Sequence, residues 1–281
     1  MSKTLAIILN HNLPEYTDWL YQELKRGEGE LYDLRVMDNG SRPEGMPATV
    51  HYRLEKNIYL GGAWNEAFRI VLENPQYDSL LFLNNDIEVN GRVFVKLLRD
   101  ELFRHDYAIL SPCVAGRPKA WNQMQNWGSK EPRQVRWTDF ESPMFHRKII
   151  EAVGQFSTDL YYGWGQELVC ADLCAERGWK IAICDHVAIL HYGNQTLIQN
   201  RLYHPKDEQD QSEEKPAGLT ETQTRALQEY RDYFSRNPLK HGTLDEYRTY
   251  GQEYQFVQTD AEKPTTGRKT TGNWLKSILG Q

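Results

Sequence analysis

Three polar side chains that could bind a metal ion follow the most apolar stretch of the chain. Residues 80–83 read Leu-Leu-Phe-Leu, and Asn84, Asn85 and Asp86 come directly after them. A carboxylate with amide neighbours can hold a hard divalent cation and leave the cation's other coordination positions open for phosphate oxygens. The same residue types also form ordinary turns after core strands, so this stretch alone fits a metal site and a simple turn equally well.

The apolar stretch predicts the element that positions these side chains. Four consecutive large apolar residues are too few for a typical helix and fit a strand that is buried on both faces. A buried strand that ends in an acidic residue is typical of the carboxyl edge of an open α/β sheet, where ligands bind beyond the strand ends. We therefore expect residues 79–89 to run from the centre of a sheet into a ligand site.

Alternating strands and helices precede this stretch. Strands are predicted at residues 5–9, 31–37 and 51–54, with helices that begin at Pro14 and near Ala63, and another helix follows around residues 94–98. The first two strands end in polar clusters, at residues 10–12 and 38–41. Strands and helices in alternation, with polar residues after each strand, predict a doubly wound α/β fold.

The second half of the chain predicts shorter elements. These are strands at residues 108–110, 134–137, 143–146, 179–184 and 187–190, a short helix ending at Gly154, and a helix from about Gln166 to Arg177. Beyond about residue 195 the composition changes: residues 205–216 are polar and acidic, a helix is expected through Phe234, and residues 274–279 could form a last amphipathic turn or two. The chain is therefore divided into residues 1–196 and a C-terminal extension of residues 197–281.

The overall composition is that of an ordinary soluble protein. The 281 residues are 26% charged and 40% hydrophobic, and the net charge of -6 exerts no global attraction on nucleic acid or anionic membrane. No apolar run is long enough to span a membrane, and the N-terminus reads as a strand instead of a signal peptide, so a cytoplasmic location is expected. The four cysteines are expected to be reduced and packed as apolar residues. A zinc site of Cys170, Cys174, Cys184 and His186 can be drawn, but its spacing fits no paired Cys-x-x-Cys pattern.

The order of four motifs resembles a known enzyme family. A first strand ending near Asn12, the Asp-Asn-Gly-Ser of residues 38–41, the Asn57…Gly61…Asn65 segment and the Leu-Asn-Asn-Asp of residues 83–86 occur in sequence. This set resembles the GT-A fold glycosyltransferases of family 2, particularly their rhamnosyltransferase-like members. Trp-Gly-Gln-Glu at residues 164–167 and a late strand ending in His191 fit the same resemblance. The fold it implies is a GT-A (Rossmann-like) mixed α/β sheet flanked by helices, followed here by a helical C-terminal extension.

The resemblance implies roles for the polar residues after the strands. Asp38 would accept a hydrogen bond from the imide N–H of uracil or thymine, which favours a UDP- or dTDP-sugar donor. Asp86 and His191 would bind Mn²⁺ or Mg²⁺, although Asn84 stands where the family often has a second aspartate. The other residues assigned to nucleotide binding are Asn10, Asn12, Gly61 with Gly62, Asn65, Asn84 and Asn85.

The resemblance also implies a catalytic base. Glu167 occupies the position where family members commonly have an aspartate within an acidic pair, but here its neighbour is Gln166. Asp172 is the alternative base, and it could equally be a solvated surface acid. Trp164 would stack on a sugar ring, or else pack in the core.

The function implied is that of a metal-dependent, inverting glycosyltransferase, either a hexosyl- or a pentosyltransferase. It would move a sugar from a nucleoside-diphosphate donor to a hydroxyl acceptor, with a saccharide as the expected acceptor. A modified base in nucleic acid is an alternative acceptor, because residues 121–137 interleave three tryptophans with Lys130, Arg133 and Arg136. A non-catalytic nucleotide-sugar or glycan-binding module is another alternative. A nucleotidyltransferase and a dinucleotide-binding dehydrogenase fit poorly, because no glycine-rich phosphate loop follows the first strand.

Overall fold

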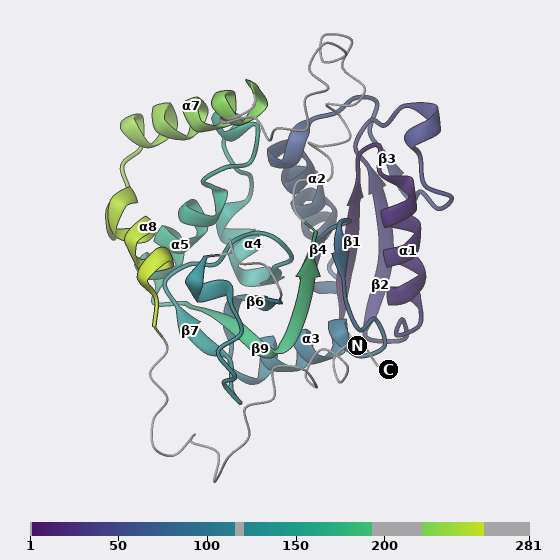
Figure 1. Cartoon of the computed structure of the whole chain (residues 1–281), viewed down its shortest axis with the longest axis horizontal. Helices are drawn as coiled ribbons and strands as arrows, with labels where there is room; N and C mark the ends of the chain where they lie inside the picture. Colours follow the sequence, from purple (N-terminus) through teal and green to yellow (C-terminus); the bar gives the residue numbers. More distant parts are fainter. Residues whose placement is uncertain (1, 116–120, 193–220, 256–281) are drawn as a thin grey trace, which may run out of the picture.

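The fold is known from a computed structural model that describes residues 2–115, 121–192 and 221–255. In these residues nine strands form a single sheet with helices on both sides (Figure 1). The strands are β1 (Lys3–Asn10), β2 (Tyr32–Asp38), β3 (Tyr52–Arg53), β4 (Tyr77–Asn84), β5 (Ile87–Glu88), β6 (Tyr107–Ala115), β7 (Arg133–Val135), β8 (Met144–His146) and β9 (Lys180–His191). The helices are α1 (Pro14–Lys25), α2 (Tyr59–Glu73), α3 (Phe94–Arg104), α4 (Arg147–Val153), α5 (Gln166–Arg177), α7 (Glu221–Arg236) and α8 (Leu244–Glu253).

The N-terminal half of the sheet is parallel and has the order β3-β2-β1-β4. Parallel strands place their carboxyl ends at one edge of the sheet. The register shows which residues meet there: Asn10 pairs with Asp38, and Leu9 pairs with Asn84. Helix α1 packs on β1 and β2, and α2 packs on β4. The polar residues after three strands therefore meet at the same edge of the sheet, as the sequence predicted.

The C-terminal half of the sheet is mixed. Strand β8 is antiparallel to both β4 and β6, β6 is parallel to β9, and β5 and β7 each run antiparallel to β9. The short strand β5 begins directly after Asp86, and its Ile87 pairs with His191 at the end of β9. This pairing brings Ile87, and with it the preceding Asp86, next to His191, although the two segments are far apart in the sequence.

An aromatic cluster joins the two halves of the sheet. Trp64 of α2 is fully buried and stacks on Phe82 of β4 with ring centroids 4.0 Å apart. The same indole meets Phe145 of β8 edge to face at 5.2 Å, and Phe140 at 5.3 Å. Burial of each large aromatic side chain stabilises the fold by roughly 1.5–3 kcal/mol, so this cluster fixes α2 against the strands that carry the polar edge.

The structure differs from the predicted elements in two places. The two strands expected at residues 179–184 and 187–190 are one continuous strand, β9, whose register against β6 shifts between Pro112 and Cys113. A bulge therefore accounts for the apparent break in the sequence pattern. Helix α8 was not predicted, although Thr243 and Glu246 form a capping box at its start.

Helices α7 and α8 of the extension pack against the rest of the chain at one end of the sheet, with α5, while α1 covers the opposite end (Figure 1). Phe234 and Tyr247 are both buried, and Nε1 of Trp137 donates a hydrogen bond to the carbonyl of Tyr247 at 3.0 Å. The predicted linker at residues 205–216 and the segment 274–279 lie outside the described residues. Among the helices that are described, none is long and apolar enough to cross a membrane.

Candidate active site

His191 lies between two carboxylates at the polar edge of the sheet. Its Nε2 is 3.1 Å from Oδ1 of Asp86, and its Nδ1 is 3.0 Å from Oε1 of Glu141. All three side chains are less than one-tenth exposed. Burial alone would lower the pKa of His191, but the hydrogen bonds to Asp86 and Glu141 outweigh it and raise this pKa to about 9. The ring is therefore an imidazolium that donates to both acids.

Asp86 and His191 also have the chemistry of a cation site, with Glu141 orienting the imidazole through its other ring nitrogen. Carboxylate oxygens suit Mn²⁺ or Mg²⁺, and a neutral imidazole nitrogen can serve as a further ligand. A bound cation would take over the charge balance that the proton on His191 now provides. The predicted pair Asp86 and His191 is thus brought together, and Glu141 joins it. Glu141 was missed because it stands in a loop without periodicity, just before β8.

Asp38 lies at the same edge but is held by the protein itself. It is fully buried, and its oxygens accept hydrogen bonds from Nδ2 of Asn10 at 2.8 Å and from the backbone N–H of Ser41 at 3.1 Å. The Asn10 amide also contacts Ser41, Gly45 and Thr17. Asn10 and Asp38 therefore fix the shape of the loops that follow β1 and β2, and neither side chain presents an exposed surface.

Partly exposed polar groups lie beside this buried pair. Nδ1 of His11 contacts the carbonyl of Asn39 at 2.9 Å, and its Nε2 contacts the amides of Asn57 at 3.1 Å and Asn12 at 3.2 Å. Burial lowers the pKa of His11, so the ring is neutral and accepts these two hydrogen bonds. Asn12 also accepts from the backbone N–H of Arg42 at 3.0 Å. His11 and Asn57 were not assigned a role from the sequence.

The glycine-rich start of α2 serves a close contact within the protein. A Cβ atom added at Gly61 would lie 2.4 Å from the carbonyl oxygen of Leu160. At Gly62 the added Cβ would meet the side chain of Ile58 at 2.8 Å. Asn65 forms a reciprocal pair with the backbone of Phe156, at 3.1 and 2.8 Å. Gly61 and Asn65 thus attach α2 to the segment that leads into the Trp164 loop.

The two asparagines before Asp86 have different surroundings. Nδ2 of Asn85 donates to Oγ1 of Thr17 at 2.9 Å, and Asn85 is 5% exposed, so it ties β4 to the start of α1. Asn84 ends β4 and is partly exposed. Of the two, Asn84 is the one that a ligand at the sheet edge could reach.

The loop of residues 163–167 carries an exposed aromatic ring and a partly buried acid. Trp164 is 40% exposed, which excludes core packing as its role. Gly165 has φ = 92°, and a Cβ atom there would lie 2.7 Å from the ring of Phe234. Only glycine fits this left-handed position under α7. Glu167 lies in the first turn of α5, and one of its oxygens accepts from the backbone N–H of Gly165 at 3.1 Å.

Glu167 has the acidity that a base at neutral pH requires. Burial, together with the nearby negative charge of Asp139, raises the pKa of its carboxyl group to about 8. Asp139 is two residues before Glu141, so one short loop faces both Glu167 and the imidazole of His191. This loop therefore connects the candidate base with the candidate cation ligands.

Asp172 and Gln166 are engaged elsewhere. The carboxylate of Asp172 accepts hydrogen bonds from the backbone N–H groups of Lys240 at 3.1 Å and His241 at 2.7 Å. Gln166 is fully buried, with its amide 3.4 Å from the carbonyl of Leu160. Asp172 holds the turn before α8, which leaves Glu167 as the better placed base.

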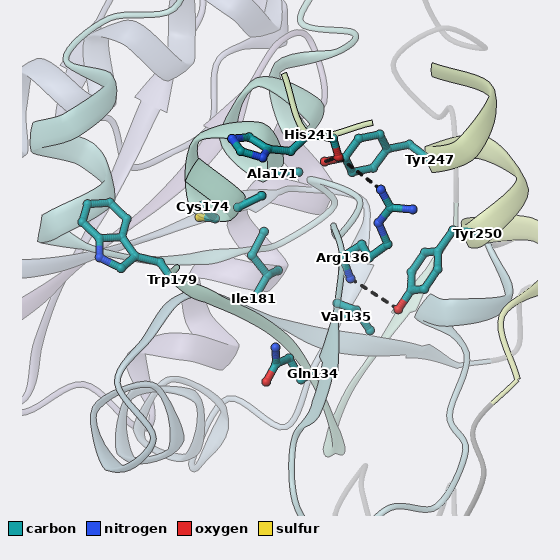
Figure 2. A pocket seen from close by; sticks show the side chains of 11 residues that line it. Gln134, Val135, Arg136, Ala171, Cys174, Trp179, Ile181, His241, Tyr247 and Tyr250 are labelled. Carbon is teal, nitrogen blue, oxygen red and sulfur yellow. Dashed lines mark hydrogen bonds between the residues drawn. The ribbon is translucent and has the colours of Figure 1, made fainter. Parts of the chain in front are cut away.

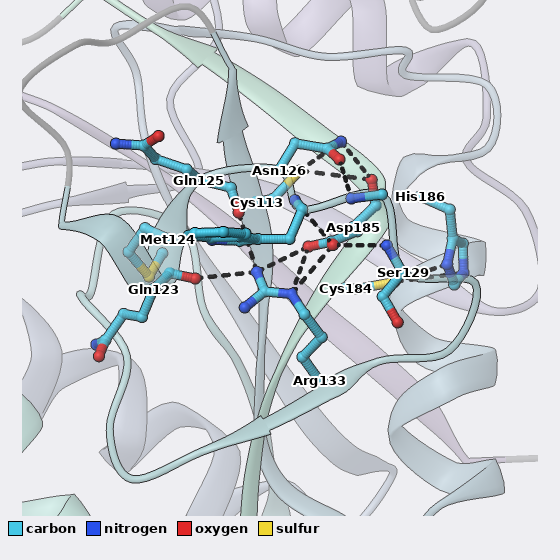
Figure 3. Close-up of polar contacts among 12 residues, drawn as sticks. Cys113, Gln123, Met124, Gln125, Asn126, Ser129, Arg133, Cys184, Asp185 and His186 are labelled. Atoms are coloured by element: carbon cyan, nitrogen blue, oxygen red, sulfur yellow. Dashed lines mark hydrogen bonds and ion pairs between the residues drawn. The ribbon is translucent and has the colours of Figure 1, made fainter. Parts of the chain in front are cut away.

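The basic and aromatic segment at residues 121–137 does not form the expected surface. Figure 3 shows Arg133 facing the carboxylate of Asp185, with contacts at 2.8–3.0 Å and both side chains 1% exposed. Trp137 is 3% exposed, and the guanidinium of Arg136 lies 4.6 Å from the ring centre of Tyr247. Arg133 and Trp137 are thus buried, whereas Lys130 and Arg136 are exposed, so only part of the interleaved patch is accessible to nucleic acid.

A separate pocket lies between β7, α5 and α8, as Figure 2 shows. Its volume is about 330 Å³, and it is lined by residues including Arg136, Trp179, His241, Tyr247 and Tyr250. Arg136 crosses its rim: its backbone N–H donates to Tyr250 at 3.3 Å, and its guanidinium donates to the carbonyl of His241 at 3.3 Å. None of the residues assigned to nucleotide binding, metal binding, catalysis or sugar stacking lines this pocket.

Comparison with known proteins identifies the fold. No protein-family model and no curated protein sequence matches this chain. Among solved structures, S. aureus TarS (residues 1–349) matches with a TM-score of 0.50 and 14% identity, over 88% of this chain and 77% of the other. GalNAc-T7 with UDP, GalNAc and Mn²⁺ matches with a TM-score of 0.55 and 13% identity, over 85% of this chain and 58% of the other. Both are glycosyltransferases, and the chain shares their fold, which confirms the GT-A fold predicted from the sequence.

Proposed function

We propose that this protein is a metal-dependent, inverting glycosyltransferase. Its donor is a UDP- or dTDP-sugar, and its acceptor is a hydroxyl group of a saccharide. The observation that carries the proposal is the loop of residues 138–142, because Glu141 contacts His191 beside Asp86 while Asp139 faces Glu167. These two contacts of one short loop support the assignment of Asp86 and His191 as cation ligands and of Glu167 as the base of the same site.

The donor diphosphate binds beside Asp86, His191 and Glu141. When bound there, Mn²⁺ or Mg²⁺ supplies the positive charge that stabilises the leaving diphosphate. That the GalNAc-T7 structure of the same fold contains UDP and Mn²⁺ supports this choice of ligands. The loops after β1 and β2 receive the base and ribose, with His11, Asn12 and Asn57 as accessible polar groups and Asn10 and Asp38 as the buried pair that holds those loops in place.

Glu167 removes the proton of the acceptor hydroxyl. The hydroxyl oxygen attacks the anomeric carbon as the bond to the diphosphate breaks on the opposite side, so a single displacement inverts the configuration. A pKa of about 8 keeps a fraction of Glu167 ionised at neutral pH and makes it a stronger base than an ordinary carboxylate. Trp164, exposed one turn before Glu167, offers a flat apolar face for the acceptor or donor sugar.

The alternatives differ in what they require. A non-catalytic binding module needs the donor site but no base, whereas the raised pKa of Glu167 beside Asp139 is typical of a catalytic group. Transfer onto a modified nucleic-acid base needs an accessible basic surface, and Arg133 is unavailable for one because it is buried against Asp185. A saccharide acceptor is therefore the better supported choice.

A panel of nucleotide sugars, each with and without Mn²⁺, tests the proposal. We expect a UDP- or dTDP-sugar to raise the melting temperature only when Mn²⁺ is present. The same donor should then be hydrolysed slowly, and Asp86→Ala should abolish this turnover. Protection without hydrolysis in the wild type would favour the binding module, and protection by purine nucleotides instead would contradict the assigned donor.

A further inference from the structure

A second group of potential metal ligands lies away from the active site, at the C-terminal end of α3. Glu101 and His105 are one turn apart on one face of this helix, and Glu131 reaches them from the loop before β7. Nε2 of His105 is 3.2 Å from Oε2 of Glu101 and 3.4 Å from Oε2 of Glu131. Among the described residues, one ligand atom from each of these three side chains lies within 4.8 Å of the others.

Two of these atoms are buried without a hydrogen bond. The side chain of Glu101 is 7% exposed, yet its Oε2 has no hydrogen-bond partner, and neither has Nε2 of His105. Both atoms point at the same place but do not meet with the geometry of a hydrogen bond. Burial of such polar atoms without partners costs free energy, so a ligand bound between them would stabilise the fold.

A fourth side chain stands next to the group. Nε2 of His186, in β9, lies 3.6 Å from Oε1 of Glu101. The sulfur of Cys184 is 3.3 Å from the same imidazole nitrogen.

We propose that Glu101, His105 and Glu131 bind a zinc ion, with His186 available as the fourth ligand. With His186 this group offers two imidazole nitrogens beside its carboxylates, a donor set that suits Zn²⁺, whereas the group of Asp86, Glu141 and His191 offers a single imidazole. The half-exposed Glu131 and the partly exposed His105 give the ion a path from solvent. The zinc ion joins α3, the loop that ends at β7, and β9, three segments that are distant in the sequence.

This site is distinct from the candidate active site. His186 lies in the bulge of β9, and the regular strand from Ala188 to His191 alone separates the bulge from His191 by roughly 10 Å. Asp86 therefore cannot share an ion with Glu101 and His105. The same strand connects a zinc ion at one position with the catalytic cation at another.

Titration calorimetry on the full chain tests the proposal. The protein and its Asp86→Asn variant are first stripped with a chelator and then titrated with ZnCl₂ in excess Mg²⁺, because Zn²⁺ competes with Mg²⁺ for the active site unless its carboxylate ligand is removed. We expect one zinc ion per chain and a rise in melting temperature of about 5 °C when free zinc is about 100 times Kd. Glu101→Gln and His105→Gln should lose this binding, and Glu131→Gln should weaken it at least tenfold.

Two controls separate this site from other sources of zinc binding. Asp100→Asn removes a neighbouring carboxylate of α3 that pairs with Lys96, and Asp86→Asn removes the active-site ligand, so both should retain one zinc ion. If His105→Gln does not fold, Glu131→Gln decides the question, because Glu131 is 61% exposed and its loss does not disturb the core. The proposal is wrong if the wild type binds no zinc, if Glu131→Gln binds it unchanged, or if Asp86→Asn abolishes it.

Discussion

Nε2 of His191 lies 3.1 Å from Oδ1 of Asp86, although 105 residues separate the two in the chain. The pairing of β5 with the end of β9 produces this contact, and both side chains are nearly buried. The first expectation concerns this pair. Asp86→Asn keeps the shape of the side chain but removes its charge, so we expect sugar transfer with Mn²⁺ to fall by about 100-fold or more.

Electron paramagnetic resonance of free Mn²⁺, measured alongside transfer rates, checks the effect of Asp86→Asn. Binding of Mn²⁺ should weaken together with turnover. Glu66→Gln, which removes a carboxylate from the surface of α2, serves as the control and should leave both unchanged. Full activity of Asp86→Asn at low Mn²⁺ would contradict the role assigned to this residue.

We expect Glu141 to be as important for Mn²⁺ affinity as a residue that binds the ion directly. Its Oε1 holds Nδ1 of His191 at 3.0 Å and so sets the orientation of the ring. Glu141→Gln should lower the affinity for Mn²⁺ by about 10–100-fold, as is usual when a carboxylate beside a ligating imidazole is lost. A Mn²⁺ titration of donor hydrolysis measures this change, and an unaltered midpoint would show that Glu141 only supports the fold.

The pKa of Glu167 predicts how activity depends on pH. As a base, Glu167 works only when ionised, so kcat/KM should rise with pH and level off above about 8. Glu167→Gln should lower kcat by about 100-fold or more and remove this limb of the profile. A flat profile between pH 6 and 9 in the wild type would mean that another group accepts the proton.

The same shift predicts how stability depends on pH. The carboxyl pKa is raised from 4.5 to about 8 in the folded protein, so between these values the folded state binds more protons than the unfolded chain. The free energy of unfolding therefore decreases as pH rises through this range. The glutamine of Glu167→Gln does not ionise, so the variant does not lose stability as the pH rises. Its melting temperature should exceed that of the wild type at pH 8 but match it near pH 4. If the melting temperatures of the variant and the wild type differ by the same amount at pH 4 and pH 8, ionisation of Glu167 does not affect stability.

Trp164 and Trp19 form a matched pair for testing sugar stacking. Both are well exposed, at 40% and 46%, but Trp19 lies on α1 and Trp164 on the loop before Glu167. Trp164→Ala should raise KM for the sugar whose ring it contacts by about 3–10-fold, with little change in melting temperature. Trp19→Ala should change neither quantity. A similar effect of both substitutions would indicate a general loss of stability instead of a binding contact.

The buried pair of Arg133 and Asp185 is expected to be sensitive to loss of one partner. Asp185→Asn leaves the guanidinium buried without its counter-ion and should lower the free energy of unfolding by about 3–5 kcal/mol. Urea denaturation measures this change. The double substitution Arg133→Met with Asp185→Leu removes both charges and should recover part of the loss. Equal loss in the single and double variants would show that the backbone bonds of Asp185 to Trp127 and Ser129 dominate.

The sequence predicted the parts of the site that follow from strand order. Asn10, Asp38, Asn84 and Asp86 end neighbouring parallel strands, so their meeting at one edge follows from the topology alone. The position of Glu141 could not be predicted, because it depends on where an irregular loop packs. The sequence also did not show that Asp38 and Asn10 satisfy each other, since hydrogen bonding between loops depends on three-dimensional packing. Helix α8 escaped notice because it is polar, although its Thr243–Glu246 cap was a readable signal.

Helix α7 packs against the loop before Glu167, so a protein that lacks this helix would have an altered site. Tyr230 and Phe234 lie against Gly165, and Glu229 accepts a hydrogen bond from the backbone N–H of Tyr162 at 3.1 Å. A protein shortened to residues 1–196 would lose these contacts of α7 with the loop before Glu167, and water would reach the carboxyl of Glu167. Its acidity would return toward that of an ordinary glutamate, so the shortened protein would keep its donor site but lose the base suited to neutral pH.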